Sequence, residues 1–430
     1  MGDQVDISQF PKILTNMGST NEEVLMLSGL IPRLHYLLQF GTPKQAFESS
    51  WALTNIASGT TEHTNFIVEN GIVHTFIVLL NSPDLELAEQ CLWGIGNISG
   101  DSVQMRDFVL SLNVTDAIVQ LSQKSCQPDT LIRNIAWTIG NLLRGKPHPD
   151  IKYAKPFLPV LHRLIKVEHL PITDELFRET LYSFYYAAEH SEIIKEIFFE
   201  FRNNGTLEKL FRFLDNRTTK LPSLRVLCSL LVGSTLVAAI LDCNILDYLL
   251  VFLGDEREII VKESLCALYN ITSTYKNYVQ RVIDSKVFQK VFNFCVLGSH
   301  KIRYEALYVV GNTLTKATPQ QVEYLVSIDL AKFLGVLLDY VIQNEDIYIH
   351  KAYFLSLKAV FTKPEGDQLV QICDNFQTHG WNVHFKKLLN AKADDYCSDI
   401  IKETFYIYTE GHKPTISSDN IIVGLSNFQI

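Results

Sequence analysis

Helical patterns of apolar and polar residues alternate with short breaks along most of the chain, and strand-like alternation is nowhere sustained. In segments such as ESSWALTNIASG and ILDYLLVFLGDERE, apolar residues recur at intervals of three and four, as they do on one face of a helix. Gly or Asn before an apolar run, and Ser-Pro-Asp or Gly-Asp-Glu after it, mark helix boundaries. The pattern predicts a repeated unit: a short helix, a helix ending in Leu-Leu, a turn, and a long third helix.

One pair of residues, an aromatic followed four positions later by an asparagine, returns at a nearly constant spacing. Trp51/Asn55 is followed by Trp93/Asn97 and Trp137/Asn141, at steps of 42 and 44 residues. A helical repeat of ~40–47 residues is typical of armadillo and HEAT solenoids. The sequence therefore predicts an all-α, armadillo-repeat, right-handed superhelical solenoid of about nine to ten repeats of three helices. The same phase continues, with changed residues, through Tyr182/Tyr186, Arg225/Ser229, Cys266/Asn270, Tyr308/Asn312 and, more faintly, Leu355/Ala359.

The repeated pair predicts a binding face on the third helices. Residues i, i+3 and i+4 share one face of a helix, so Glu48 projects beside Trp51 and Asn55. Tryptophans in register form slots for aliphatic stems with cationic heads, and a row of carboxamides holds an extended backbone. We therefore predict that this face binds extended peptides rich in lysine and arginine. Acidic residues flank the slots: Glu48, Glu89, Asp101, Glu179, Glu263 and Glu305.

Composition narrows the classes of function. The net charge of −9 opposes nucleic-acid binding, which needs a basic face. The eight cysteines include no C-x-x-C pair, so neither a metal site nor a redox motif is indicated. The stretch Gly140 to Lys146 fits G-x-x-x-x-G-K, but Pro147 stands where a P-loop needs Ser or Thr. We predict a protein that is not an enzyme, needs no cofactor, and binds neither nucleic acid nor membrane.

One apolar stretch, Val226 to Leu241, carries no charge over sixteen residues. It is shorter than the ~20 residues that span a bilayer, and it contains Ser, Gly and Thr. In the phase of the repeat it falls on a third helix and the turn that follows. It is therefore predicted to be part of the helical array.

The motifs WALTNIASGT, EQ-x-x-W-x-x-GNISGD and RN-x-x-W-x-x-x-N are similar to armadillo repeats of importin-α, the nuclear-import adaptor family. The similarity covers most of the chain and is densest over residues 48–145. It implies a receptor for nuclear-localisation signals, present in cytoplasm and nucleus, in which Asp101 receives the key lysine of the signal. The implied major site consists of Trp51, Asn55, Ser58, Gly59, Thr64, Gln90, Trp93, Asn97, Asp101, Asn134, Trp137 and Asn141.

The resemblance also implies a minor peptide site, where this chain departs from the family pattern. Cys266 and Tyr308 stand at positions that hold tryptophan in the family, and Tyr182 replaces a third one. We therefore expect this site to be weaker, with little dependence on bipartite signals. The implied residues are Tyr182, Tyr186, Arg225, Cys266, Asn270, Glu305, Tyr308 and Asn312.

Three parts of the chain are predicted: a partial first repeat in residues 1–28, a solenoid over 29–413, and a loose tail over 414–430. The major site falls at about 48–145 and the minor site at about 222–315. Importin-α proteins begin with a basic segment that binds importin-β and folds back onto the groove, whereas residues 1–28 hold one basic residue, Lys12. We expect an open groove without self-inhibition and without the usual importin-β contact.

The resemblance implies three kinds of partner: basic signal peptides of cargo proteins, importin-β and an export receptor. Two alternatives stay open at this point, an armadillo scaffold and a relative that sequesters basic signals without recruiting importin-β. A catenin-like scaffold would need a basic groove for acidic ligands, and the acidic flanks oppose it.

Overall fold

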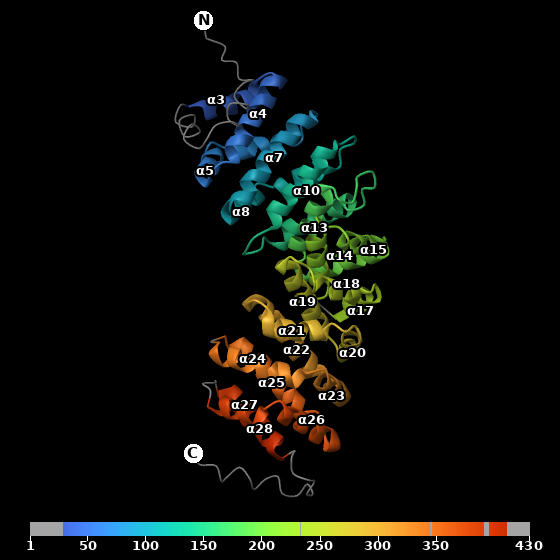
Figure 1. Cartoon of the computed structure of the whole chain (residues 1–430). Helices are drawn as coiled ribbons and strands as arrows, with labels where there is room; N and C mark the ends of the chain where they lie inside the picture. The colour runs from blue at the N-terminus through green and yellow to red at the C-terminus, as the bar shows by residue number, and fades with distance from the viewer. Residues whose placement is uncertain (1–28, 233, 345, 391–394, 411–430) are drawn as a thin grey trace. The chain divides into compact units, whose positions relative to one another are not determined.

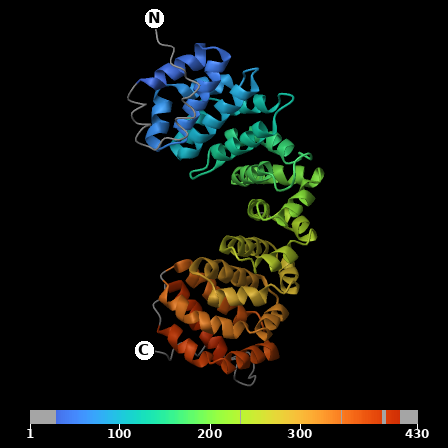
Figure 2. The same ribbon diagram turned by 45° about the horizontal axis from the view of Figure 1, so that its top comes forward.

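The computed structural model describes residues 29–232, 234–344, 346–390 and 395–410, and every regular element among them is a helix (Figure 1). These residues form two compact units, unit 1 ending at Leu230 and unit 2 beginning at Leu231. In each unit, successive helices pack side by side in layers (Figure 2). The predicted partial repeat in residues 1–28 and the tail over 414–430 lie outside the described residues.

The described helices follow the predicted three-helix unit, and nine third helices can be assigned among them. The first helices are α5 (Thr61–Glu69), α8 (Val103–Ser111), α11 (Ile151–Ala154) with η2 (Lys155–Phe157), α14 (Ser191–Asn203), α17 (Ser234–Asp242), α20 (Lys276–Asp284), α23 (Pro319–Ser327) and α26 (Gly366–Thr378). The second helices are α3 (Leu30–Phe40), α6 (Ile72–Leu79), α9 (Val114–Ser122), α12 (Leu158–Leu164), α15 (Thr206–Leu214), α18 (Ile245–Phe252), α21 (Phe288–Leu297), α24 (Leu330–Gln343) and α27 (Trp381–Leu389). The third helices are α4 (Pro43–Ala57), α7 (Leu85–Asp101), α10 (Asp129–Leu143), α13 (Glu175–Ala187), α16 (Lys220–Leu230), α19 (Glu258–Ser273), α22 (His300–Lys316), α25 (Ile347–Thr362) and α28 (Asp395–Glu410).

Most second helices begin just after a residue in the left-handed backbone region. Gly71 has φ 74° before α6, Asn113 and Asn244 have φ 59° before α9 and α18, and Asp329 has φ 78° before α24. Glycine adopts this conformation without a steric penalty, and Asn and Asp tolerate it better than most residues. The Gly and Asn breaks read from the sequence are therefore the sharp turns between first and second helices.

Within each unit, every third helix packs on the next: α4, α7, α10, α13 and α16 in unit 1, and α19, α22, α25 and α28 in unit 2. In unit 1 buried hydroxyls fix the register of this stack. Thr54 Oγ1 donates to the carbonyl of Gln90 at 3.0 Å, and Ser183 Oγ donates to that of Ala136 at 2.9 Å. Because these bonds recur between successive third helices, equivalent positions of the repeat line up along the stack.

The uncharged stretch from Val226 to Leu241 is divided between α16 and α17, so it reaches further into the next repeat than the turn predicted for it. Its two halves pack as ordinary parts of the array, with Leu227 and Ile240 fully buried. Among the described residues, no helix has the length and hydropathy that a bilayer crossing requires.

Candidate functional site

A depression of about 270 Å³ lies in unit 1, where α4, α7 and α10 approach their C-terminal ends. The last carbonyls of a helix carry partial negative charge, so three helix ends at one place favour a cation. Six of the twelve residues predicted for the major site line this depression: Ser58, Gly59, Asn97, Asp101, Trp137 and Asn141.

Asp101, the last residue of α7, brings a carboxylate into the depression. Its Oδ1 accepts a hydrogen bond from Thr61 Oγ1 at 3.0 Å, which fixes the orientation of the group. Its Oδ2 is buried and has no donor among the described residues. An unpaired buried acceptor of this kind costs about 1–3 kcal/mol, and more when charged. A cationic donor entering the depression would remove that cost.

Two further buried acceptors without a donor among the described residues occur on the same stack. They are Oε2 of Glu48 on α4 and Oε1 of Gln90 on α7. Glu48 lies three positions before Trp51, and Gln90 lies three positions before Trp93, so both precede one of the repeated tryptophans. The predicted acidic flank is therefore present on α4, and its equivalent on α7 is an uncharged acceptor.

The tryptophans of α7 and α10 are placed differently. Trp93 is 39% exposed, an unusual state for so large an apolar side chain. Trp137 is half-buried, and a Cβ on Gly96 would come within 2.2 Å of its Cζ3. Glycine at position 96 thus lets the indole of α10 lie directly on the backbone of α7. Trp51 is half-buried beside Phe47, with ring centroids 6.4 Å apart.

The asparagine row has a more specific arrangement than the sequence indicates. Asn97 Nδ2 donates to the carbonyl of Thr54 at 3.2 Å, and Asn141 Nδ2 donates to that of Gly96 at 3.0 Å. Because each amide nitrogen faces the preceding helix, each amide oxygen remains an acceptor for a ligand. The two side chains therefore couple neighbouring repeats, and Asn141 is buried while it does so.

Three other residues predicted for the major site form hydrogen bonds with neighbouring residues of the protein. Asn134 Nδ2 donates to Glu89 Oε1 at 2.9 Å, and burial raises the pKa of Glu89 above its usual value. Thr64 is 1% exposed, and its hydroxyl donates to the carbonyl of Thr60. Ser58 Oγ donates to the carbonyl of Asn55 at 2.7 Å. Thr64 is thus buried, and its predicted ligand contact stays a prediction.

Sequence reasoning missed Arg144 and Gly100, which also line the depression. The guanidinium of Arg144 donates to the carbonyl of Gly100 at 2.7 Å. The carbonyl of Arg144 itself accepts from Arg106 Nη1 at 2.7 Å. Their positions in the sequence could have indicated them, because Arg144 directly follows α10 and Gly100 lies one helical turn after Gly96.

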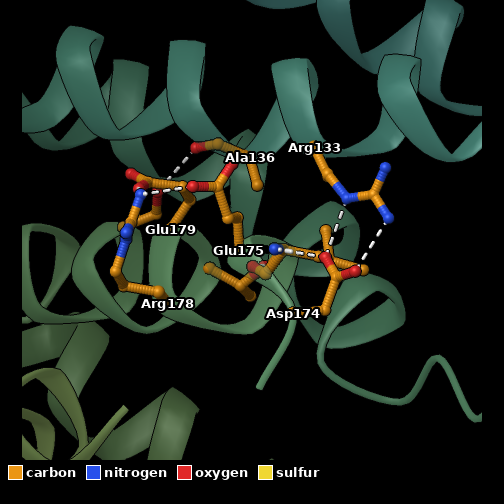
Figure 3. Close-up of polar contacts among 9 residues, drawn as sticks. Arg133, Ala136, Asp174, Glu175, Arg178 and Glu179 are labelled. Carbon is orange, nitrogen blue, oxygen red and sulfur yellow. Dashed lines mark hydrogen bonds and ion pairs between the residues drawn. The ribbon is translucent and has the colours of Figure 1, made fainter. Parts of the chain in front are cut away.

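On α13, and between its N-terminus and α10, charged side chains pair with one another (Figure 3). Arg178 Nη2 lies 2.8 Å from Glu179 Oε1, and Arg133 binds both carboxylate oxygens of Asp174, at 2.8 and 2.7 Å. Glu179 of the predicted acidic flank is therefore already paired with a cation of its own helix.

The residues predicted for the minor site fall in both units. In unit 1, the rings of Tyr182 and Tyr186 stack with centroids 6.2 Å apart, and Arg225 lies over Tyr185 at 5.4 Å. Both tyrosines predicted here are half-buried on α13. The structure thus places an aromatic pair beside the Arg178–Glu179 ion pair.

In unit 2, Tyr308 belongs to a cluster of phenols on α19 and α22. Its ring centroid is 4.8 Å from that of Tyr304 and 5.8 Å from that of Tyr269. Neither Tyr304 nor Tyr269 was predicted from the sequence, because neither stands at the position of the repeat that holds Trp51, Trp93 and Trp137. Burial raises the pKa of Glu305, whose carboxylate lies 3.9 Å from Lys262. The other predicted members are Cys266, half-buried, Asn270, buried, and Asn312, whose Nδ2 is buried without an acceptor among the described residues.

A larger depression, about 700 Å³, lies between α12 and α14 and holds none of the predicted residues. His162 lines it and packs against Phe184 and Phe201 at 5.1 and 5.5 Å. Burial lowers the pKa of His162 to about 4, so the ring is neutral at physiological pH. Its surroundings are those of a core histidine.

Comparison with known proteins found one matching family model and several similar proteins. The Armadillo/beta-catenin-like repeat family matches residues 60–100. The chain is 40% identical over 176 residues to "Probable importin subunit alpha-A" of Dictyostelium discoideum, covering 38% of this chain and 32% of that protein. It is 30% identical over 292 residues to "Importin subunit alpha-1a" of Oryza sativa subsp. japonica, covering 66% of this chain and 54% of that protein.

The aligned regions thus span about half or less of the length of these relatives. A crystal structure of an engineered protein shares the fold, with a TM-score of 0.79 over 94% of each chain at 18% identity. The repeat match covers α5, α6 and nearly all of α7, the helix that carries Trp93 and Asn97. Over the aligned parts of its length, the chain is therefore a relative of the importin subunits alpha, and it contains an armadillo repeat.

Proposed function

We propose that unit 1 binds Lys/Arg-rich nuclear-localisation signals in an extended conformation across α4, α7 and α10, and that the protein acts as an adaptor for nuclear import between cytoplasm and nucleus. The observation that carries the proposal is the carboxylate of Asp101, held by Thr61 on one oxygen and unpaired on the other, in a depression at three helix ends. A lysine ammonium supplies the missing donor and the opposite charge.

The rest of the face complements such a ligand. An extended chain advances ~3.3 Å per residue, so each repeat passes two to three residues of peptide. The amide oxygens of Asn97 and Asn141, which these Nδ2 bonds leave unused, accept backbone N–H groups of the peptide, and this requires no particular peptide side chain. The exposed indole of Trp93 covers aliphatic stems and attracts their cationic heads. Backbone contacts thus provide affinity, and Asp101 provides selection for a cation.

A titration tests the proposal directly. A labelled peptide with a cluster of lysines and an analogue with glutamine at each lysine are titrated with the intact protein, and binding is followed by fluorescence anisotropy. Because a hydrogen bond to a charged group contributes about 1.5–3 kcal/mol, we expect the lysine peptide to bind about a hundredfold more tightly. Equal affinity for the two peptides would contradict the proposal.

A matched pair of variants locates the contact. Trp93→Ala removes an exposed aromatic side chain from the proposed face, whereas Phe108→Ala removes one of similar exposure from α8. Trp93→Ala is expected to weaken binding of the lysine peptide about tenfold, from lost cation–π attraction and stem burial. Phe108→Ala should leave affinity unchanged, and an equal loss in both variants would place the peptide elsewhere.

A further inference from the structure

The acidic residue three positions before the repeated aromatic residue (Trp51 on α4, Tyr182 on α13) is paired differently on the two helices. On α4 it is Glu48, whose Oε2 is buried without a donor among the described residues. On α13 it is Glu179, whose Oε1 accepts from Arg178 Nε at 2.9 Å and from Nη2 at 2.8 Å (Figure 3). The equivalent positions on α7 and α10 hold Gln90 and Asn134. Among these four positions, only those on α4 and α13 carry a carboxylate, and the one on α13 is already paired with an arginine of the protein.

The ion pair on α13 is partly shielded from water. The side chain of Glu179 is 18% exposed and that of Arg178 is 38% exposed. Arg178 Nη2 also lies 3.4 Å from Glu175 Oε1, so two carboxylates of its own helix hold it in place. The nearby Arg133 does not compete for Glu179, because both oxygens of Asp174 bind its guanidinium. The positive charge at Glu179 thus comes from Arg178.

Beside this pair, α13 offers the other elements of a cation slot. Tyr182 follows Glu179 by three positions and stacks on Tyr186 with an interplanar angle of 19°. Both rings are half-buried, so each keeps an accessible part. A carboxylate and an aromatic face at this spacing are the components that Trp51 and Glu48 supply on α4.

We propose that Arg178 acts as an internal ligand that closes a fourth cation subsite of the groove, formed by Glu179 and Tyr182. The proposal rests on the peptide-binding function proposed above. A ligand lysine at α13 would only exchange one ion pair of Glu179 for another, so the net gain in affinity would be small. The chain would therefore recognise basic residues over α4 to α10 and gain nothing from an added cation at α13. Arg178 is in this sense a specificity-determining residue.

The test compares wild type with Arg178→Met, which keeps the aliphatic stem and removes the charge. Each is titrated with a short lysine peptide and with two longer ones, extended by two lysines at one end or the other. For wild type, we expect both extensions to change affinity less than threefold. For Arg178→Met, we expect one extended peptide to bind about tenfold more tightly than to wild type, with the short peptide within twofold.

A second background separates the closed subsite from a general charge effect. In Glu179→Gln, the substitution Arg178→Met should give no selective gain for the extended peptide, because the carboxylate that receives the lysine is gone. An equal gain for short and extended peptides, a gain that persists in Glu179→Gln, or no gain at all would overturn the inference.

The two proposals fail in different ways. If wild type binds the short lysine peptide no better than its glutamine analogue, the peptide-binding function itself fails, and the subsite with it. If wild type discriminates between those two peptides and Arg178→Met shows no selective gain, only the closed subsite fails. Circular dichroism of each variant checks that the helices are intact before titration.

Discussion

Replacing Asp101 by asparagine is expected to lower the affinity for a lysine-rich peptide about tenfold to a hundredfold. Asparagine keeps the size of the side chain and an oxygen for the hydrogen bond from Thr61 Oγ1. It removes the negative charge from the depression at the ends of α4, α7 and α10. Since a charge-assisted hydrogen bond contributes about 1.5–3 kcal/mol and 1.4 kcal/mol is tenfold in affinity, the loss follows from one contact. Fluorescence anisotropy or calorimetry measures it.

The control for overall charge is Asp116→Asn, which removes an exposed carboxylate from α9. It changes the net charge by the same amount but lies on a second helix, away from the residues that line the depression. At physiological salt, charges more than ~8 Å apart in solvent are largely screened, so its effect should be less than twofold. If both substitutions weaken binding equally, the peptide responds to net charge and Asp101 is not its contact.

The largest expected loss of stability follows from Arg106→Met. The side chain of Arg106 is 1% exposed, and its guanidinium donates to the carbonyls of Arg144 and Pro147 at 2.7 and 2.8 Å. Methionine fills similar space but leaves both carbonyls without this donor. We expect the free energy of unfolding of unit 1 to fall by about 2–4 kcal/mol, because hydrogen bonds made by a charged group contribute about 1.5–3 kcal/mol each. Hydrogen exchange of α8 and α10 reports the change locally, which suits a repeat array.

Arg106 also positions part of the binding site, since the chain segment it holds carries Arg144 into the depression. The variant should therefore weaken peptide binding as well. Arg202→Met, at an exposed position near the end of α14, is the matched control and should change exchange rates in α8 and α10 by less than twofold. Unchanged protection in Arg106→Met would show that the two carbonyls do not depend on this guanidinium.

Most of the fold could be predicted from the repeat period, because a solenoid makes contacts mainly between neighbouring repeats. The spacing of Trp51, Trp93 and Trp137 placed three third helices in phase, and the structure stacks those helices directly on one another. The breaks at Gly71 and Asn113 were also readable, since few residues accept a left-handed backbone. In this part of the chain, the helix breaks and the spacing of the tryptophans both indicate the same repeat boundaries.

The sequence was less informative about how side chains pair. A spacing of three residues puts Glu179 and Tyr182 on one face, but it does not say that Arg178 turns onto Glu179. Likewise, Tyr304 and Tyr269 join Tyr308 from outside the ladder phase, through the packing of α22 on α19. These contacts depend on rotamers and on neighbouring helices, which periodicity does not encode.

A crystal structure of the intact protein with a lysine-rich peptide bound would show the Asp101 contact directly. We expect an extended peptide across α4, α7 and α10, with one lysine Nζ within hydrogen-bond distance, about 3 Å, of Asp101 Oδ2. We also expect peptide N–H groups to donate to the amide oxygens of Asn97 and Asn141. A peptide bound on another face, or one whose lysines do not contact Asp101, would show that Asp101 is not the lysine-binding residue.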